Sequence, residues 1–348
     1  MEMLECGYAS VGEFHSVHHQ SGGQNYENIA ETSCRIINAA QKTGIGLTYL
    51  PVFYMQGGLN GKKLAEGQLR FGNELEQYLR ILDQTQNSLR NAPKDYLLGM
   101  APHSLRAVSP EFLKEIVEAR SSDTVRIHIA EQLKEVEEIQ THFDARPVEW
   151  LLNNIAVDSR WCLIHATHMT QEETQNLAKS GAIVGLCPIT EANLGDGVFD
   201  GTELLLSGGK YGIGYDSNVR ISLTEELRLL EYSQRLVRKE RNVMTSKTGS
   251  VDRALYDDSL TGGAQALARK SGSIVPGNWA DLLTLDAEAL TLSGCTEDEI
   301  LDRWIFSGDD SLVREVWSAG RQMVADVQHI RHEEIELKYR SVIQEIRQ

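Results

Sequence analysis

Three short apolar segments end in residues that can bind a metal or move a proton. The first begins at Val125 and reads Val-Arg-Ile-His-Ile-Ala-Glu, which places His128 three residues before Glu131. The second, Cys-Leu-Ile-His, ends at His165, and the third, Gly-Ile-Gly-Tyr-Asp, ends at Asp216. In barrel enzymes the ends of successive strands carry the catalytic residues, and imidazole and carboxylate groups are suitable zinc ligands. The three segments together predict one metal-assisted hydrolytic site.

Each of these signals has a simpler explanation when it is taken alone. A solvated helix start also gives His-x-x-Glu, so this motif is weak evidence for catalysis. A single buried His or Asp could equally be a core polar group with hydrogen-bond partners. The order His, His, Asp at the ends of three consecutive segments favours a shared site over three separate accidents.

Other polar residues offer weaker signals. The cluster His15, His18 and His19 lacks His-x-His spacing, which favours a structural or substrate-side role over metal binding. His168 is expected in a loop. Cys187 is expected to pack at the end of a strand, because no base stands near it in the sequence.

Composition limits the partners and the compartment. The chain has 348 residues and a formal net charge of −16, which argues against nucleic acid or an anionic membrane as partner. No apolar segment approaches the ~20 residues that span a bilayer, and the N-terminal residues lack the pattern of a signal peptide. The five cysteines have no Cys-x-x-Cys spacing. Free thiols in the cytoplasm are therefore expected.

The segments between these residues alternate between strand-like and helix-like patterns. Strands are predicted to begin near residues 8, 46, 96, 125, 162, 182 and 212, with helices between them and a loop at 188–199. This alternation predicts parallel βα units, and a closed barrel needs eight strands. The first residues resemble the end of the helix after strand one, so that strand is expected to be the missing one.

The character of the chain changes near residue 236. A basic, turn-rich link at 235–250 precedes a helix, short strands at 272–277 and 280–286, a hairpin at 313–324 and a charged helix at 332–347. The prediction is an α/β fold: a (β/α)8 TIM-like barrel without its first strand at 1–235. Residues 236–348 are expected to form the end of the barrel, a small C-terminal β-sandwich portion and a C-terminal helix.

Several longer motifs resemble one enzyme family. The sequences HIAEQ at 128–132, WCLIHATH at 161–168 and GIGYDSNV at 212–219 are similar to the amidohydrolase superfamily, as is GSIVPGNWADLLTLD at 272–286. Within it, HSLRAV at 103–108 and TEANLGDG at 190–197 resemble the formimidoylglutamate deiminases. The resemblance runs over nearly the whole chain. It implies zinc-dependent hydrolysis of N-formimino-L-glutamate to N-formyl-L-glutamate and ammonia, a step of histidine degradation.

The resemblance also implies roles for individual residues. His128 and Asp216 would bind one zinc ion per chain, with iron or another divalent metal as alternatives. Glu131 would move protons between water and the imino nitrogen, with Asp216 beside the nucleophile, and His165 would stabilise the tetrahedral intermediate. A metal suits this reaction, because a formimino carbon reacts poorly with neutral water.

Two further residues are expected to bind the substrate. Arg106 can hold a carboxylate through two parallel hydrogen bonds, although it could also be an ordinary surface charge. His103 follows the preceding strand by two residues and is expected to be a second polar contact. The partner is therefore a small-molecule substrate, and a homodimer is a further expectation from the family.

The sequence departs from the family in its metal ligands. The family takes two zinc ligands from a His-x-His motif at the end of strand one, and this sequence has no His-x-His. Ser16 and Tyr215 stand where the family often has tyrosine and serine. Two other interpretations therefore stay open. One is a related zinc amidohydrolase or deaminase that acts on another amidine or an aminated ring. The other is an inactive truncated remnant, or a subunit that a partner completes.

Overall fold

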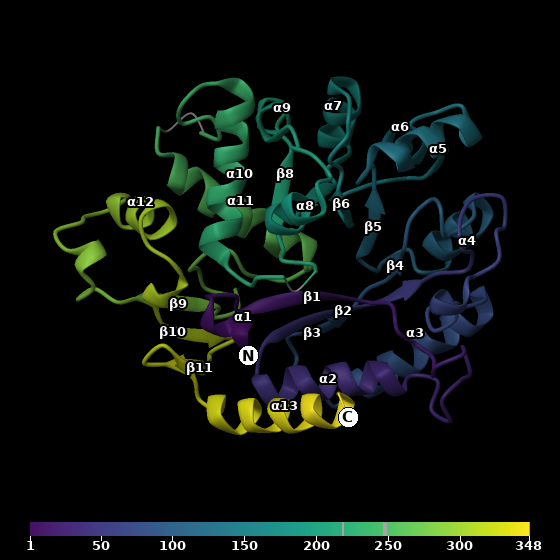
Figure 1. Ribbon diagram of the computed structural model, residues 1–348, viewed down its shortest axis with the longest axis horizontal. Helices are drawn as coiled ribbons and strands as arrows, with labels where there is room; N and C mark the ends of the chain where they lie inside the picture. Colours follow the sequence, from purple (N-terminus) through teal and green to yellow (C-terminus); the bar gives the residue numbers. More distant parts are fainter. Residues whose placement is uncertain (218, 246–248, 348) are drawn as a thin grey trace.

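The computed structural model describes residues 1–217, 219–245 and 249–347 (Figure 1). Residue 218 of the third motif and residues 246–248 of the predicted link lie outside these ranges. No helix in the described ranges is long and apolar enough to cross a membrane.

Strands form at all seven positions that the sequence predicts, and they run parallel. β1 pairs with β2, and β2 pairs with both β3 and the short β4 that continues it, while β5 to β8 pair in chain order. A bridge between Met100 and Val125 joins the two groups. Among the described residues β8 and β1 do not pair, so the barrel is open between them. The strands are β1 (Ser10–His15), β2 (Gly46–Phe53), β3 (Tyr96–Leu98), β4 (Ala101–Pro102), β5 (Val125–Ile129), β6 (Trp161–His165), β7 (Ile183–Leu186) and β8 (Lys210–Ile213).

Helices follow the strands and cover the outside of the barrel, as Figure 1 shows. They start and stop at ordinary signals: Ser222 accepts a hydrogen bond from the Glu225 amide at the start of α10, and Gly44 ends α2 with φ 72°. The helices are α1 (Glu2–Glu5), α2 (Glu31–Thr43), α3 (Leu75–Leu89), α4 (Pro110–Ala119), α5 (Leu133–Phe143), α6 (Pro147–Asn154), α7 (Gln171–Ser180), α9 (Gly201–Leu206), α10 (Leu223–Arg238) and α11 (Val251–Ala266), with a 3₁₀ turn at Glu66–Gln68.

The segment predicted as a loop at 188–199 contains a helix, so that prediction is wrong over most of its length. α8 (Pro188–Leu194) begins with proline at its first position and ends at Gly195, whose φ is 73°. The amide of a first-turn residue has no acceptor within the helix, so proline, which lacks the amide hydrogen, fits there. Glycine readily adopts the left-handed conformation at the end of the helix. Both features are helix boundary signals. A helix of seven residues is too short for a clear apolar period.

The C-terminal residues form one antiparallel sheet with helices beside it. Its strand order is β12-β11-β10-β9, and the predicted hairpin is the β10–β11 pair. The strand predicted at 272–277 is wrong, because this segment is a turn in which Ile274 is 87% exposed. The elements are β9 (Leu282–Leu285), α12 (Glu299–Phe306), β10 (Val313–Ser318), β11 (Arg321–Ala325), β12 (Gln328–His329) and α13 (His332–Ile346), with 3₁₀ turns at Leu290–Leu292 and Asp310–Leu312. The division of the chain at residues 235 and 236 stays a prediction.

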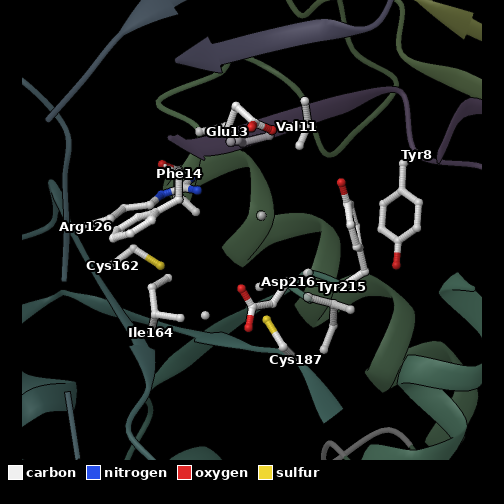
Figure 2. A pocket seen from close by; sticks show the side chains of 18 of the residues that line it. Tyr8, Val11, Glu13, Phe14, Arg126, Cys162, Ile164, Cys187, Tyr215 and Asp216 are labelled. Carbon is white, nitrogen blue, oxygen red and sulfur yellow. Dashed lines mark hydrogen bonds between the residues drawn. The ribbon is translucent and has the colours of Figure 1, made fainter. Parts of the chain in front are cut away.

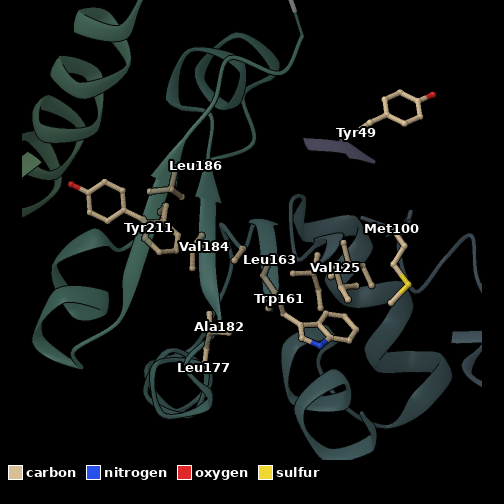
Figure 3. Packing of buried hydrophobic residues seen from close by; sticks show 14 of the residues in the cluster. Tyr49, Met100, Val125, Trp161, Leu163, Leu177, Ala182, Val184, Leu186 and Tyr211 are labelled. Atoms are coloured by element: carbon tan, nitrogen blue, oxygen red, sulfur yellow. The ribbon is translucent and has the colours of Figure 1, made fainter. Parts of the chain in front are cut away.

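Strand residues alternate between the outer core and the barrel interior. Trp161, Leu163, Val184 and Tyr211 are fully buried and face the helices (Figure 3). Their neighbours in the strands, such as Cys162, line the interior instead. The core between the strands and the helices therefore holds the strands in place. Because this packing does not depend on the strand ends, they can carry polar side chains.

Candidate active site

A cavity of about 230 Å³ lies inside the open barrel and is bordered by both of its unpaired edges (Figure 2). Glu13 and Phe14 enter it from β1, and Tyr215 and Asp216 enter it from the end of β8. His128 lines the same cavity from β5. The two residues predicted as metal ligands therefore open onto one space.

His165 is the centre of the polar cluster at the strand ends. Its side chain is 1% exposed, and its Nε2 lies 3.8 Å from Glu131 Oε1 and 4.0 Å from Asp216 Oδ2. Its ring stacks on that of His128 with the centroids 5.4 Å apart. The four residues predicted from three separate segments thus lie together, as the sequence led us to expect. Their individual roles stay proposals.

The backbone is strained where these side chains leave their strands. Ala130, His165 and Asp216 have φ values of 50°, 67° and 51°. Residues other than glycine in this left-handed region cost roughly 1–3 kcal/mol each, and they cluster at functional sites. These left-handed residues turn the chain sharply, so the side chains of the cluster project across the strand ends.

Thr190 and Glu191 of α8 support the cluster from outside, and no role is predicted for either from the sequence. Thr190 Oγ1 donates a hydrogen bond to the Tyr215 carbonyl oxygen at 2.8 Å and accepts one from the Ser217 amide at 3.2 Å, which fixes the backbone on both sides of Asp216. Glu191 Oε1 lies 3.2 Å from His165 Nδ1. The sequence feature that could have pointed to these two supporting residues is the Thr-Glu pair in the motif at 190–197.

Glu131 is held by the first turn of α5. The carboxylate of Glu135 accepts hydrogen bonds from the amides of Ala130 and Glu131 at 3.2 Å and 3.1 Å. Burial raises the pKa of Glu131, which His165 partly offsets. A carboxyl group with a raised pKa and a fixed backbone is suited to proton transfer.

His103 and Arg106 line a second, wider pocket of about 710 Å³. The two pockets lie next to each other, because the ring centroid of His103 lies 5.1 Å from that of His128, which lines the first cavity. Arg106 Nε is buried and has no hydrogen-bond partner within the described chain. Because an unpaired buried donor is costly, this guanidinium is suited to an anionic ligand.

His103 and His128, which lie between the two pockets, are held in their neutral form. Burial, together with the neighbouring His103 and His165, lowers the pKa of His128 well below its ordinary value. Burial and Arg106 lower the pKa of His103 to about 4. Neutral imidazole is the form that binds metals, so His128 is ready to act as a ligand.

The side chains at the cavity are of types that bind a divalent metal, but too few of them lie together to complete a site. An imidazole and a carboxylate, His128 and Asp216, are ligands that zinc accepts. Among the described residues, however, no three His, Cys, Asp or Glu side chains gather closely enough to hold a metal ion. A catalytic zinc takes three protein ligands. The described residues therefore account for only part of a zinc site.

Two histidines of the cluster after β1, His18 and His19, have hydrogen-bond partners in neighbouring segments. His18 Nε2 lies 2.9 Å from the Val52 carbonyl oxygen, and His19 Nε2 lies 2.8 Å from that of Gly72. Both side chains are buried, and they tie the segment after β1 to its neighbours. These contacts fit the structural half of the expected structural or substrate-side role, which stays a prediction.

Comparison with known proteins decides the family. The sequence model of the amidohydrolase family matches residues 1–323. The chain belongs to the amidohydrolase family. Amidohydrolases are hydrolytic enzymes, so the chain is a hydrolase with a small-molecule substrate, and the family resemblance is confirmed.

Two relatives of this amidohydrolase cover most of it. A formimidoylglutamate deiminase from Pseudomonas aeruginosa is 48% identical over 331 residues, which are 94% of this chain and 73% of that enzyme. The crystal structure of an amidohydrolase from Brucella melitensis has a TM-score of 0.96 and 46% identity over all of this chain and 77% of its own. The predicted α/β barrel fold is confirmed by these matches.

A more distant structure shares the fold alone. An adenosine deaminase from Xanthomonas campestris, solved with bound zinc, has a TM-score of 0.76 and 20% identity over 93% of this chain and 70% of its own.

Proposed function

We propose that the chain hydrolyses N-formimino-L-glutamate to N-formyl-L-glutamate and ammonia. The observation that carries this proposal is the buried and unpaired Nε of Arg106. Arg106 lines the same pocket as His103, whose ring lies 5.1 Å from that of His128 in the polar cluster. Such a cation suits an acidic substrate whose reacting group reaches the cluster. The 48% identity to the deiminase of P. aeruginosa supports the same substrate.

The reaction adds water to the formimino carbon and releases its terminal nitrogen. The carbon–nitrogen double bond becomes a tetrahedral centre, and cleavage of the bond to that nitrogen leaves a formyl group and ammonia. Glu131 is proposed to take one proton from the attacking water and a second from the new hydroxyl group. It delivers both to the departing nitrogen, which leaves as ammonia. His165 is proposed to stabilise the negative charge on the tetrahedral centre in its protonated form, in which Nε2 also carries a hydrogen. Burial opposes this form, but the carboxylates of Glu191 and Glu131 outweigh it and raise the pKa of His165.

A zinc ion is proposed as the cofactor, with His128 and Asp216 as ligands. Zinc, when bound, would make water a nucleophile near neutral pH. Iron or another divalent metal is an alternative. The further ligands would have to come from outside the described residues, so completion by a partner stays a proposal beside this one.

The substrate can be tested through Arg106. In Arg106→Ala we expect the second-order rate constant for N-formimino-L-glutamate to fall roughly 10²-fold or more, because a charge-assisted hydrogen bond is worth about 1.5–3 kcal/mol and a lost bidentate contact removes two of them. The measurement is ammonia release across a panel of acidic and uncharged amidines and aminated rings. Arg106→Lys should retain an intermediate rate, because lysine keeps the charge and loses the paired geometry.

The same panel decides between the two enzymatic proposals. A wild-type preference for uncharged rings, with Arg106→Ala unaffected, would favour the related deaminase over the formimidoylglutamate deiminase. The exposed Arg90→Ala is a matched control, since Arg90 lies at the end of α3 and lines neither pocket. A cytoplasmic location and a homodimer stay proposals that rest on composition and on the family.

A further inference from the structure

We propose that Glu191 is a positioning residue that holds the His165 ring and keeps a proton on its Nδ1, so that Nε2 faces the reacting groups. The benefit to catalysis rests on the proposed function, whereas the hydrogen bond itself does not. No role is predicted for Glu191 from the sequence, and the residue lies 26 positions away from His165 in the chain.

The contact has a defined direction. Glu191 Oε1 accepts the Cys187 amide hydrogen at 2.9 Å and lies 3.2 Å from His165 Nδ1. A backbone amide can only donate, so this oxygen acts as an acceptor toward it. The same oxygen then favours a protonated Nδ1, because a lone pair on that nitrogen would face a second lone pair.

The orientation follows from this choice of tautomer. With Nδ1 committed to Glu191, the opposite nitrogen points to Glu131 and Asp216, at 3.8 Å and 4.0 Å. The side chains of His165 and Glu191 are 1% and 7% exposed, so water does not compete for either end of the contact. In metal and hydrolase sites, a carboxylate behind a histidine commonly fixes its ring and tautomer in this way.

The fold places Glu191 there through α8. The helix begins directly after β7, and the Glu191 amide donates to the Cys187 carbonyl oxygen one turn back. Ile189 is tied in turn to the buried Glu226 of α10, whose Oε2 accepts its amide hydrogen at 2.9 Å. The helix is thus fixed against the end of β7, and the side chain of Glu191 reaches the end of the neighbouring β6.

A purely structural alternative is that Glu191 serves only to accept the Cys187 amide. Nitrogen-15 spectra of the histidine rings separate the two roles, because they report directly which ring nitrogen carries the proton. The His165 signal can be assigned through its loss in His165→Gln. In the wild-type chain at alkaline pH we expect Nδ1 to be protonated, and in Glu191→Ala we expect the Nε2-protonated tautomer to gain population.

Two further variants keep this test decisive. Glu191→Gln offers a carboxamide oxygen in the same place and should retain much of the wild-type ring signal, even if Glu191→Ala does not fold. Glu231→Gln is the matched control: Glu231 is also buried and accepts the amides of Val243 and Met244, and its replacement should leave the His165 signal unchanged. A wild-type His165 without a proton on Nδ1, or a signal that Glu191→Ala leaves unchanged, would overturn the proposal.

Steady-state kinetics provide a second test of the positioning role of Glu191. Loss of a carboxylate behind a catalytic histidine typically lowers activity 10- to 100-fold, so kcat of Glu191→Ala should fall by about that factor with KM nearly unchanged. Glu191→Gln should recover most of kcat. The spectra need no substrate. Absence of turnover by the wild-type chain would therefore count against the proposed function and leave the ring assignment standing.

Discussion

Glu131→Gln is expected to lower kcat for N-formimino-L-glutamate by roughly 10²–10⁴-fold, the range attributed to a positioned general acid–base group. This corresponds to about 3–5 kcal/mol of transition-state stabilisation. Glutamine has the same shape as glutamate but cannot take a proton from water or return it to a departing nitrogen. Because Glu131 is not one of the proposed metal ligands, zinc content should stay at the wild-type level. Steady-state ammonia release and metal analysis of the same preparation measure both quantities.

The exposed Glu172→Gln provides the matched control for this substitution. Glu172 lies in the first turn of α7, and its replacement should leave kcat unchanged. If Glu131→Gln keeps kcat within about tenfold of the wild type, proton transfer by this residue is not a major part of catalysis, and the proposed mechanism is wrong.

Asp216→Asn is expected to remove both bound zinc and turnover. The neutral amide is a poorer ligand than the carboxylate, and the described residues supply only one other proposed ligand, His128. A metal that stabilises developing charge is worth several kcal/mol, so loss of about 4 kcal/mol would lower the rate by roughly 10³-fold. The side chain of Asp216 is 38% exposed, so the fold should survive the change. Zinc content, turnover and thermal unfolding should be measured together.

Asp200→Asn serves as a control of the same chemical type. Asp200 caps α9 and pairs with Arg238 on the surface, so only a small loss of stability is expected, with zinc and turnover retained. Wild-type zinc content in Asp216→Asn would show that Asp216 is not a ligand. Unchanged turnover by Asp216→Asn would show that Asp216 has no part in the mechanism.

The parallel strands were the part of the fold that the sequence predicted best. Each is a short apolar segment between turn signals. The buried neighbours Cys162 and Leu163 point to opposite faces of β6 and show why, since both faces of the strand are covered. The wrong strand at 272–277 had a similar apolar pair, Ile274 and Val275, which the structure leaves exposed. Its flanking glycines adopt φ values of 85° and 98°, and this turn geometry overrides the strand pattern of the short segment between them.

The site was predictable to the extent that strand ends determine it. His128, His165 and Asp216 each end or directly follow a predicted strand, so parallel pairing brings them together. The contact between Glu191 and His165 could not be predicted, because it depends on a seven-residue helix that has no apolar period. The unpaired Nε of Arg106 is likewise a property of packing and is not visible in the sequence.

The most direct test of the proposed function is to incubate the purified chain with zinc and N-formimino-L-glutamate and to identify both products. We expect ammonia and N-formyl-L-glutamate to form in equal amounts, with zinc bound to the active preparation. Supply of the remaining ligands by a partner would give turnover only after that partner is added. A zinc-loaded chain that releases no ammonia from this substrate, while it hydrolyses another amidine or aminated ring, would contradict the central claim.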